Sequence, residues 1–284
     1  MTLSKNCYLL AIGFIIISTQ QSVAQNEVLF QAKFKPNKTY ITEMVNNMQM
    51  DMNFDIDSAK KKEIEGKGMK LPMHMDILQE MTLSTKTGAV AADKRIPMTM
   101  TYDKVEISMT MNGKEMKQPN KFVGMQIKGY ATEEGKVSID AIEGNPDAAT
   151  KKALQKMISE VLRNVEFPNK AMKIGDSFTQ EVPMEMPMNG TTLNMLTNMT
   201  YTLKEIKESQ AFFDYTQSLS MNFKMEKGNT TATGSGRGTM IYDIPANYIT
   251  DSTSDMIMDM KMQMGEMAMK MNLKAKTSVK AKVL

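Results

Sequence analysis

The chain has 284 residues, of which 33 are Met and 15 are Leu, although Leu is among the commonest residues of globular proteins. A single His excludes a multi-histidine metal centre, and a single Cys excludes a disulfide scaffold. The hydrophobic fraction of 42% is sufficient for a core and the net charge is only +3. Intrinsic disorder and nucleic-acid binding are therefore not expected.

The N-terminus has the pattern of a secretory signal peptide. Lys5 precedes an apolar run from Cys7 to Ile17, and Ser22-Val23-Ala24 supplies small residues before a cleavage point. The run is too short for a transmembrane helix, which needs about 20 apolar residues. We expect residues 1–24 to be removed and the mature protein to be periplasmic or extracellular. Cys7 lacks the surroundings of an acylated cysteine, so the protein is not expected to be a lipoprotein.

The mature chain is dominated by strict alternation of apolar and polar residues. A period of two places all apolar side chains of a segment on one face of a β-strand. The fold class is therefore predicted to be mainly β (α+β), built from long, curved, bulged antiparallel sheet with one buried and one solvated face. No later segment has the uninterrupted apolar run of a transmembrane helix. The alternating segments are 48–56, 73–77, 81–83, 184–188, 219–225 and 256–264.

The alternation changes phase at two places. Met98, Met100 and Tyr102 are followed by odd-numbered apolar residues from Val105 onwards, and the even-numbered Met256–Met264 series is followed by an odd-numbered one from Met267. One inserted residue in a strand is a β-bulge, which bends the strand. We predict bulges at Asp103–Lys104 and at Gly265–Glu266.

One substantial helix is predicted in the middle of the chain, over residues 147–164. Asp147 can cap its first turn, and its apolar residues recur at three- and four-residue spacing, which predicts packing against a sheet face. Residues 57–70 are charged and lack such a stripe, so they are expected to form a solvated excursion between strands. The apolar helix positions are Ala149, Leu154, Met157, Ile158, Val161 and Leu162.

A short internal repeat suggests how the domain is organised. The run Phe34-Lys35-Pro36-Asn37-Lys38 recurs as Phe167-Pro168-Asn169-Lys170, and each copy leads into a Met-rich strand. We expect a single β-rich domain over residues 25–284, with two similar halves, 25–144 and 165–284, joined by the helix 147–164.

The Met stripe is the main candidate functional feature. Met is unbranched and adaptable, which suits irregular cavities and promiscuous apolar surfaces. We therefore expect a Met-lined concavity that binds an apolar small molecule or lipid. The alternative is a closed core in a structural protein that interacts with an envelope partner. The residues expected to line the concavity are Met48, Met50, Met52, Met184, Met186, Met221, Met258, Met260 and Met262.

A second alternative is periplasmic binding of Cu(I) or Ag(I), because thioethers are soft ligands. Met73-His74-Met75 brings the single His beside two Met residues. However, alternation places Met73 and Met75 on one face of the strand and His74 on the other, so the three are not expected to converge. No cofactor is expected.

Catalytic signatures are weak, and the protein is not expected to be an enzyme. Gly234-Ser235-Gly236-Arg237-Gly238 leads into the strand-like Thr239–Tyr242 and not into the helix that a phosphate loop requires. Gly at every second position leaves one strand face bare, so a neighbour must approach closely there, and we expect that neighbour to be the mid-chain helix. Asp51, Asp55 and Asp57 share a polar face that is typical of solvated strands.

Several short motifs occur along the mature chain: Lys173-Ile174-Gly175-Asp176-Ser177-Phe178, Tyr201-Thr202-Leu203, Gly236-Arg237-Gly238, Tyr242-Asp243 and the strand Met256–Met264. Together they resemble a family of exported Bacteroidota proteins that carry a domain of unknown function. The family often has Gly-Asp-Ser followed by an aromatic residue, frequently Trp, where this chain has Phe178. The resemblance implies a secreted or periplasmic location and no assigned activity. The expected shape is also similar to the half-barrel of outer-membrane lipoprotein carriers.

Overall fold

The computed structural model describes most of the predicted mature chain. The described residues are 27–66, 70–117, 122–132, 135–144, 165–188, 191–225, 228–264 and 267–284. The predicted signal peptide, residues 1–24, and the predicted helix, residues 147–164, lie outside the described residues.

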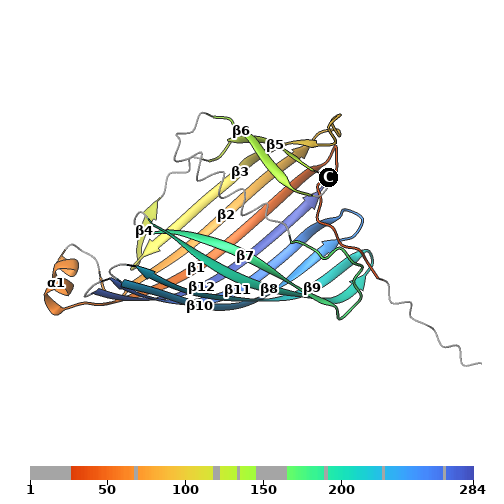
Figure 1. Cartoon of the computed structure of the whole chain (residues 1–284). Coiled ribbons are helices and arrows are strands. Elements are labelled where there is room, and N and C mark those ends of the chain that lie inside the picture. The colour runs from red at the N-terminus through yellow and green to blue at the C-terminus, as the bar shows by residue number, and fades with distance from the viewer. Residues whose placement is uncertain are drawn as a thin grey trace, which may run out of the picture.

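The described strands form one antiparallel sheet, as the alternation predicts. Its path is β6-β5-β3-β2-β1-β12-β11-β10-β9-β8-β7, and β4 pairs with β3 beside this path. Figure 1 shows the sheet curling along the path, so that β7 and β8 turn back in front of the middle strands. The strands are β1 (Thr39–Asp55), β2 (Met73–Thr87), β3 (Ile96–Met111), β4 (Lys114–Lys117), β5 (Gln126–Ala131), β6 (Val137–Ile142), β7 (Ser177–Met188), β8 (Thr191–Lys207), β9 (Gln210–Met225), β10 (Gly228–Asp243), β11 (Tyr248–Met264) and β12 (Met267–Val283).

Two-residue connections with left-handed backbone join some of the neighbouring strands. Asn112 and Gly113, with φ of 47° and 79°, connect β3 to β4, and Glu208 and Ser209, with φ of 55° and 91°, connect β8 to β9. Tight hairpin turns need positive φ because their twist then matches that of the strands. This explains why an Asn-Gly pair lies between two alternating segments.

The first predicted bulge is confirmed, and the second prediction is wrong. Thr82 of β2 lies opposite Lys104 and the next residue, Leu83, lies opposite Tyr102, so Asp103 is the extra residue. At the second position, β11 ends at Met264, and β12 begins at Met267 and pairs back with it. Across a two-residue connection between paired strands, the inward-facing residues change from even to odd numbers, just as they do after one inserted residue. The alternation alone therefore could not distinguish a bulge from a connection between two strands.

The excursion predicted at residues 57–70 contains a short helix, α1 (Ser58–Gly66). Asp57 caps it, because its carboxylate accepts a hydrogen bond from the Ala59 backbone N–H at 2.9 Å. The described side chains of α1 are exposed, in agreement with the absence of an apolar stripe. Figure 1 places α1 at one end of the curled sheet, beyond β1.

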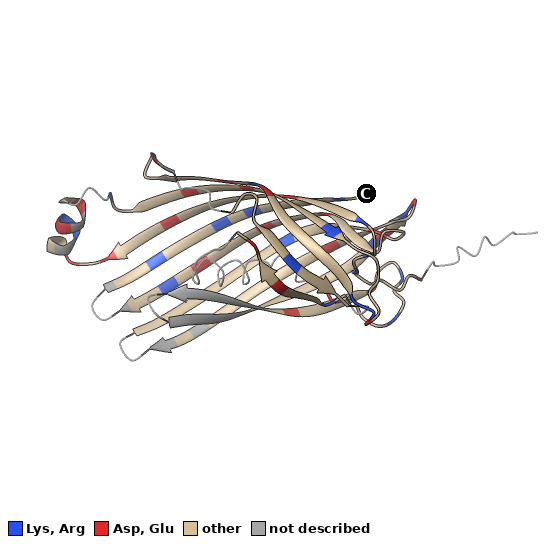
Figure 2. Cartoon of the chain, turned by 90° about the horizontal axis from the view of Figure 1, so that it is seen from above, with Lys and Arg blue, Asp and Glu red and all other residues tan. Residues whose placement is uncertain are grey.

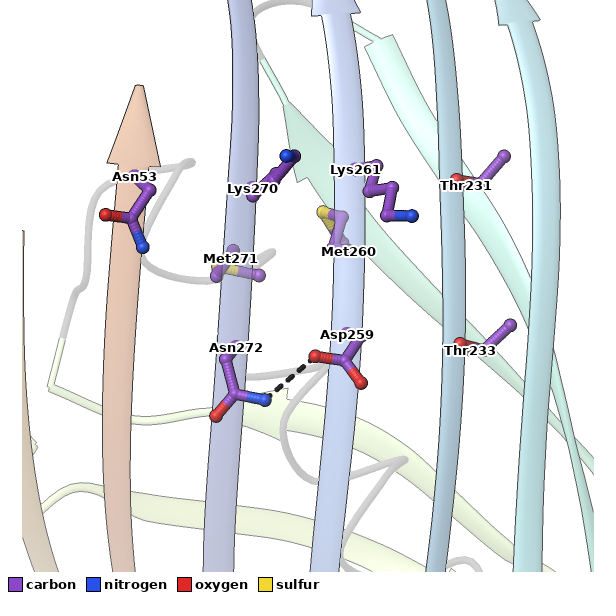
Figure 3. A pocket seen from close by; sticks show the side chains of 9 residues that line it. All are labelled: Asn53, Thr231, Thr233, Asp259, Met260, Lys261, Lys270, Met271 and Asn272. Carbon is purple, nitrogen blue, oxygen red and sulfur yellow. Dashed lines mark hydrogen bonds between the residues drawn. The ribbon is translucent and has the colours of Figure 1, made fainter. Parts of the chain in front are cut away.

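The concave face of the sheet carries the apolar side chains. In β1 the even-numbered residues are more buried than the odd-numbered ones over most of the strand, and the same alternation continues through its neighbours. Figure 3 views the sheet from the polar side, and other strands of the sheet pass behind it. Figure 2 shows acidic and basic residues interspersed along the strands. The charged residues of the strands lie mainly at exposed positions of the alternation.

Aromatic side chains fill one end of the concave face. Phe30, in the segment before β1, packs edge-on against Phe213 of β9 and Tyr242 of β10, with ring centroids 5.2 Å away in each case. Phe34 packs against Tyr40 of β1 at 4.8 Å. The Tyr242 hydroxyl donates to the Gln31 carbonyl at 2.8 Å. This end, where β1 begins and β12 ends, is thus held by the N-terminal segment.

Candidate functional site

Beyond the aromatic end, Met side chains line much of the concave face. The register of the strands brings together Met residues that lie far apart in the chain. Met50 lies opposite Met75 of β2 and Leu273 of β12. Met52 lies opposite Met73 and Met271 in the same way. Side chains directly opposite in an antiparallel pair are in contact range. The first, second and last strands therefore build one continuous Met surface.

The predicted lining residues divide into two groups by burial. Met258, Met260 and Met262 of β11 are 4%, 2% and 2% exposed, and Met221 of β9 is 7% exposed. Met48, Met50 and Met52 of β1 are only partly buried against them. On the concave face, these Met side chains of β11 are therefore almost fully covered, and those of β1 are only partly covered. We call Met258, Met260 and Met262 of β11 the floor of this face and Met48, Met50 and Met52 of β1 its wall. Met184 and Met186 lie in β7 opposite Met195 and Leu193, and their side chains lie outside the described residues.

The glycine-rich strand β10 explains how side chains cross this face. A Cβ at Gly236 would lie 2.8 Å from the Gln217 Cγ, and one at Gly238 would overlap with the Tyr215 ring. The bare strand lets Gln217 donate to the Ser254 hydroxyl at 3.0 Å and Tyr215 to the Thr253 carbonyl at 2.8 Å, both on β11. The predicted close approach is confirmed, and its partners are Gln217 and Tyr215 of β9; the helix expected as the neighbour, residues 147–164, lies outside the described residues.

Polar side chains interrupt the concave face halfway along the strands, a feature that sequence reasoning missed. The pairings Asn46↔Gln79, Asn46↔Thr277 and Thr277↔Ser254 place four of them side by side on four neighbouring strands. Gln217 reaches the same line over β10. The signal was present in β1, because Asn46 stands at an apolar position of the alternation between Met44 and Met48. We call Gln79, Asn46, Thr277, Ser254 and Gln217 the polar row.

One hydroxyl on the Met-lined half is buried and has no hydrogen-bond partner among the residues that the structure describes. Thr230 of β10 is 0% exposed and lies opposite Phe223 of β9 and Met262 of β11. Its Oγ1 makes no hydrogen bond to any described residue. A buried unpaired hydroxyl is unfavourable by roughly 1–3 kcal/mol.

His74 lies on the convex face, away from Met73 and Met75. Its Nδ1 lies 2.7 Å from an Asp51 carboxylate oxygen and its Nε2 lies 3.1 Å from one of Asp76. The hydrogen bond to Asp51, followed by the charge of Asp76, raises the pKa of the imidazole above 6.5. Met73, His74 and Met75 therefore do not converge on one ion. Over the described ranges, no three His, Cys, Asp or Glu side chains are grouped so as to hold a metal.

The convex face carries a hollow of about 460 Å³ between β1, β12, β11 and β10 (Figure 3). Lys261 and Lys270 lie directly opposite each other at its rim, and neither forms an ion pair with any of the described residues. Below them, Asn272 donates to Asp259 at 2.8 Å. Its polar rim and open shape are typical of a solvated strand surface and do not suit an apolar ligand.

No helix in the described part of the chain has the length and apolar character needed to cross a membrane.

Comparison with known proteins found no matching family model and no matching curated sequence. Among solved structures, the chain is similar to lipovitellin, in a study of lipid–protein interactions, with 10% identity and a TM-score of 0.48. That match covers 89% of this chain and 26% of lipovitellin. It is also similar to OccK7 (OpdD) of Pseudomonas aeruginosa, with 7% identity and a TM-score of 0.24, over 87% of this chain and 100% of that one. Both TM-scores lie below 0.5, so neither likeness indicates a function for the concave face.

Proposed function

We propose that this chain is an exported, non-catalytic protein that binds an apolar ligand of lipid type on its Met-lined concave face. The observation that carries the proposal is the unequal burial of the Met side chains. Met258, Met260 and Met262 are almost fully covered, whereas Met48, Met50 and Met52, on the same face, are only partly buried. The wall at β1 therefore offers apolar surface beside a completed floor.

The chemistry of the wall supports a greasy ligand of variable shape. Thioether side chains adapt to irregular apolar surfaces at little cost, because they are unbranched and polarisable. Burying one such side chain against a ligand contributes about 1.5–3 kcal/mol. Because Met48, Met50 and Met52 are already partly buried, the roughly 8 kcal/mol needed for micromolar affinity also requires the apolar surface that the ligand itself buries.

The proposal is tested with a matched pair of variants on opposite faces. Met50→Gln places a polar amide on the concave wall, and Ile257→Gln makes a similar change on the convex face, where Ile257 is 52% exposed. We expect Met50→Gln to weaken saturable binding of 1-N-phenylnaphthylamine about tenfold and Ile257→Gln to leave it unchanged.

Native mass spectrometry of protein purified from its host is expected to show a bound lipid-sized mass. If the wild-type protein has no saturable site for the dye and carries no bound mass, the concave face is a closed core and the proposal is wrong. Equal loss of dye binding in both variants would contradict the assignment to the concave face.

A further inference from the structure

We infer that the ligand is amphipathic, with an uncharged hydrogen-bonding head group on the polar row and its apolar part on the Met-lined half. This rests on the proposed function and specifies its ligand. On β1 and β2 the polar row lies between apolar cross-strand pairs. On one side of it lie Met44 and Met81, and on the other lie Met48 and Ile77, in the neighbouring cross-strand pairs of β1 and β2.

The row is built from segments far apart in the chain. The Thr277 hydroxyl donates to the Asn46 side-chain oxygen at 3.2 Å across 231 residues. Gln217 reaches Ser254 at 3.0 Å by crossing β10 at Gly236. Five strands and a glycine are thus arranged so that amides and hydroxyls meet in one line.

The row retains unused hydrogen-bonding capacity. An amide side chain offers two N–H donors and one acceptor oxygen. The Gln79 side chain forms no hydrogen bond to any described residue, and the Asn46 NH₂ donors are likewise unpaired. Both residues are partly buried in a strand face that is apolar on either side. Polar groups left unpaired in such surroundings are unfavourable, and a ligand group that pairs with them removes that penalty.

The chemistry of the row selects the class of head group. All five side chains are amides or hydroxyls and none carries a charge, so the row offers no counter-ion to a phosphate or carboxylate. An ester or hydroxyl group accepts from the amide N–H donors and, where it has an O–H, donates to the amide oxygen. A mono- or diacylglycerol type of amphiphile fits this pattern.

The dimensions agree with such a ligand. From Asn46 to the end of β1 at Asp55, the strand advances by nine residue steps, or about 30 Å at roughly 3.4 Å per residue. This equals the thickness of a bilayer hydrocarbon core, about 30 Å, which accommodates two acyl chains end to end. One extended acyl chain therefore fits on the Met-lined half with its head group at the row.

The test compares three ligands of equal chain length as competitors of 1-N-phenylnaphthylamine: 1-monodecanoylglycerol, decanoate and decane. We expect 1-monodecanoylglycerol to compete at least tenfold better than the other two. Gln79→Met preserves side-chain length without removing any existing bond, and it is expected to weaken 1-monodecanoylglycerol three- to tenfold. It should leave decane and the dye unchanged. Asn46→Leu is expected to act in the same direction, and Asn47→Leu, on the convex face of the same strand, is the control.

Three outcomes would overturn the inference: decane competes as well as 1-monodecanoylglycerol, decanoate competes best, or Gln79→Met leaves all affinities unchanged. In each of these cases the dye still binds saturably, so the proposed function stands. Absence of saturable dye binding in the wild-type protein would instead remove the proposed function itself. Thermal unfolding of each variant shows whether it is folded. If Asn46→Leu does not fold, Gln79→Met alone tests the inference.

Discussion

The crossing of β10 by side chains from β9 makes Gly236 a sharp point of perturbation. A Cβ at this position would lie 2.6 Å from the Asp255 carbonyl oxygen and 2.8 Å from the Gln217 Cγ. Favourable contacts between such atoms begin near about 3.5 Å, so the carbonyl of β11 and the Gln217 side chain must both move. Gly236→Ala therefore disturbs the sheet and the polar row together.

The expected loss of stability follows from three contributions. Overpacking of this kind destabilises by about 1–3 kcal/mol, and loss of the Gln217–Ser254 hydrogen bond adds about 1 kcal/mol. Reduced freedom of the unfolded chain offsets about 0.4–1 kcal/mol. The net change of about 2 kcal/mol corresponds to a decrease in Tm of about 4–8 °C for a chain of this size.

Circular dichroism during thermal unfolding measures the effect, with Ser235→Ala as the control. Ser235 is the exposed neighbour of Gly236 on the convex face, and its replacement is expected to change stability by less than about 0.5 kcal/mol. In the background Gln217→Ala, Gly236→Ala is expected to be less harmful, because part of the overlap is gone. A Tm for Gly236→Ala equal to or above that of the wild-type protein would refute the close approach.

Three further predictions concern single groups. Because the native pKa of His74 is raised, its stabilising effect is complete below pH 6.5 and is lost as the pH rises through the native pKa. An NMR titration should show a midpoint above 6.5 that decreases in Asp51→Asn, and an unchanged midpoint would contradict the ion pair. Burial raises the pKa of Tyr248 to about 12, so its contribution to stability should be lost as the pH rises from 10 to 12. Tyrosinate absorbance and unfolding at each pH measure this loss. If Tyr248→Phe has the same alkaline stability profile as the wild-type protein, the prediction is wrong. Thr230→Val removes an unpaired buried hydroxyl and should increase the free energy of unfolding by about 1 kcal/mol in urea, whereas a decrease would show that the hydroxyl has a partner.

Local periodicity predicted the strands and their faces because side-chain direction is fixed by the backbone alone. The bulge at Asp103 was predictable for the same reason. Parity could not distinguish a bulge from a hairpin at residues 265–266, since both shift the phase by one. The pairing of β1 with β12 is set by tertiary packing, and no local pattern of either strand contains it.

The candidate site was predictable to a similar extent. The sequence pattern assigns the Met residues of β1 and β11 to one face. It could not predict that Met260 is more buried than Met50, because burial depends on which strands are neighbours in the folded sheet. The bare face of β10 indicated a close neighbour, but Gln217 belongs to another strand and its length sets the contact. Asn46 and Gln79 become a site only once register places them side by side.

The pairing of the first strand with the last has a consequence for folding order. Thr39 and Leu284 exchange backbone hydrogen bonds of 3.2 and 2.8 Å, and β1 and β12 lie side by side within the sheet. During synthesis β1 and β11 each keep an unpaired edge until the final strand emerges, and joining them closes a loop of more than 200 residues. Contacts of such long range slow folding, and exposed strand edges invite pairing with other chains. Pairing of the seventeen residues of β12 with β1 and β11 therefore joins two separate β-meanders into one cooperative sheet.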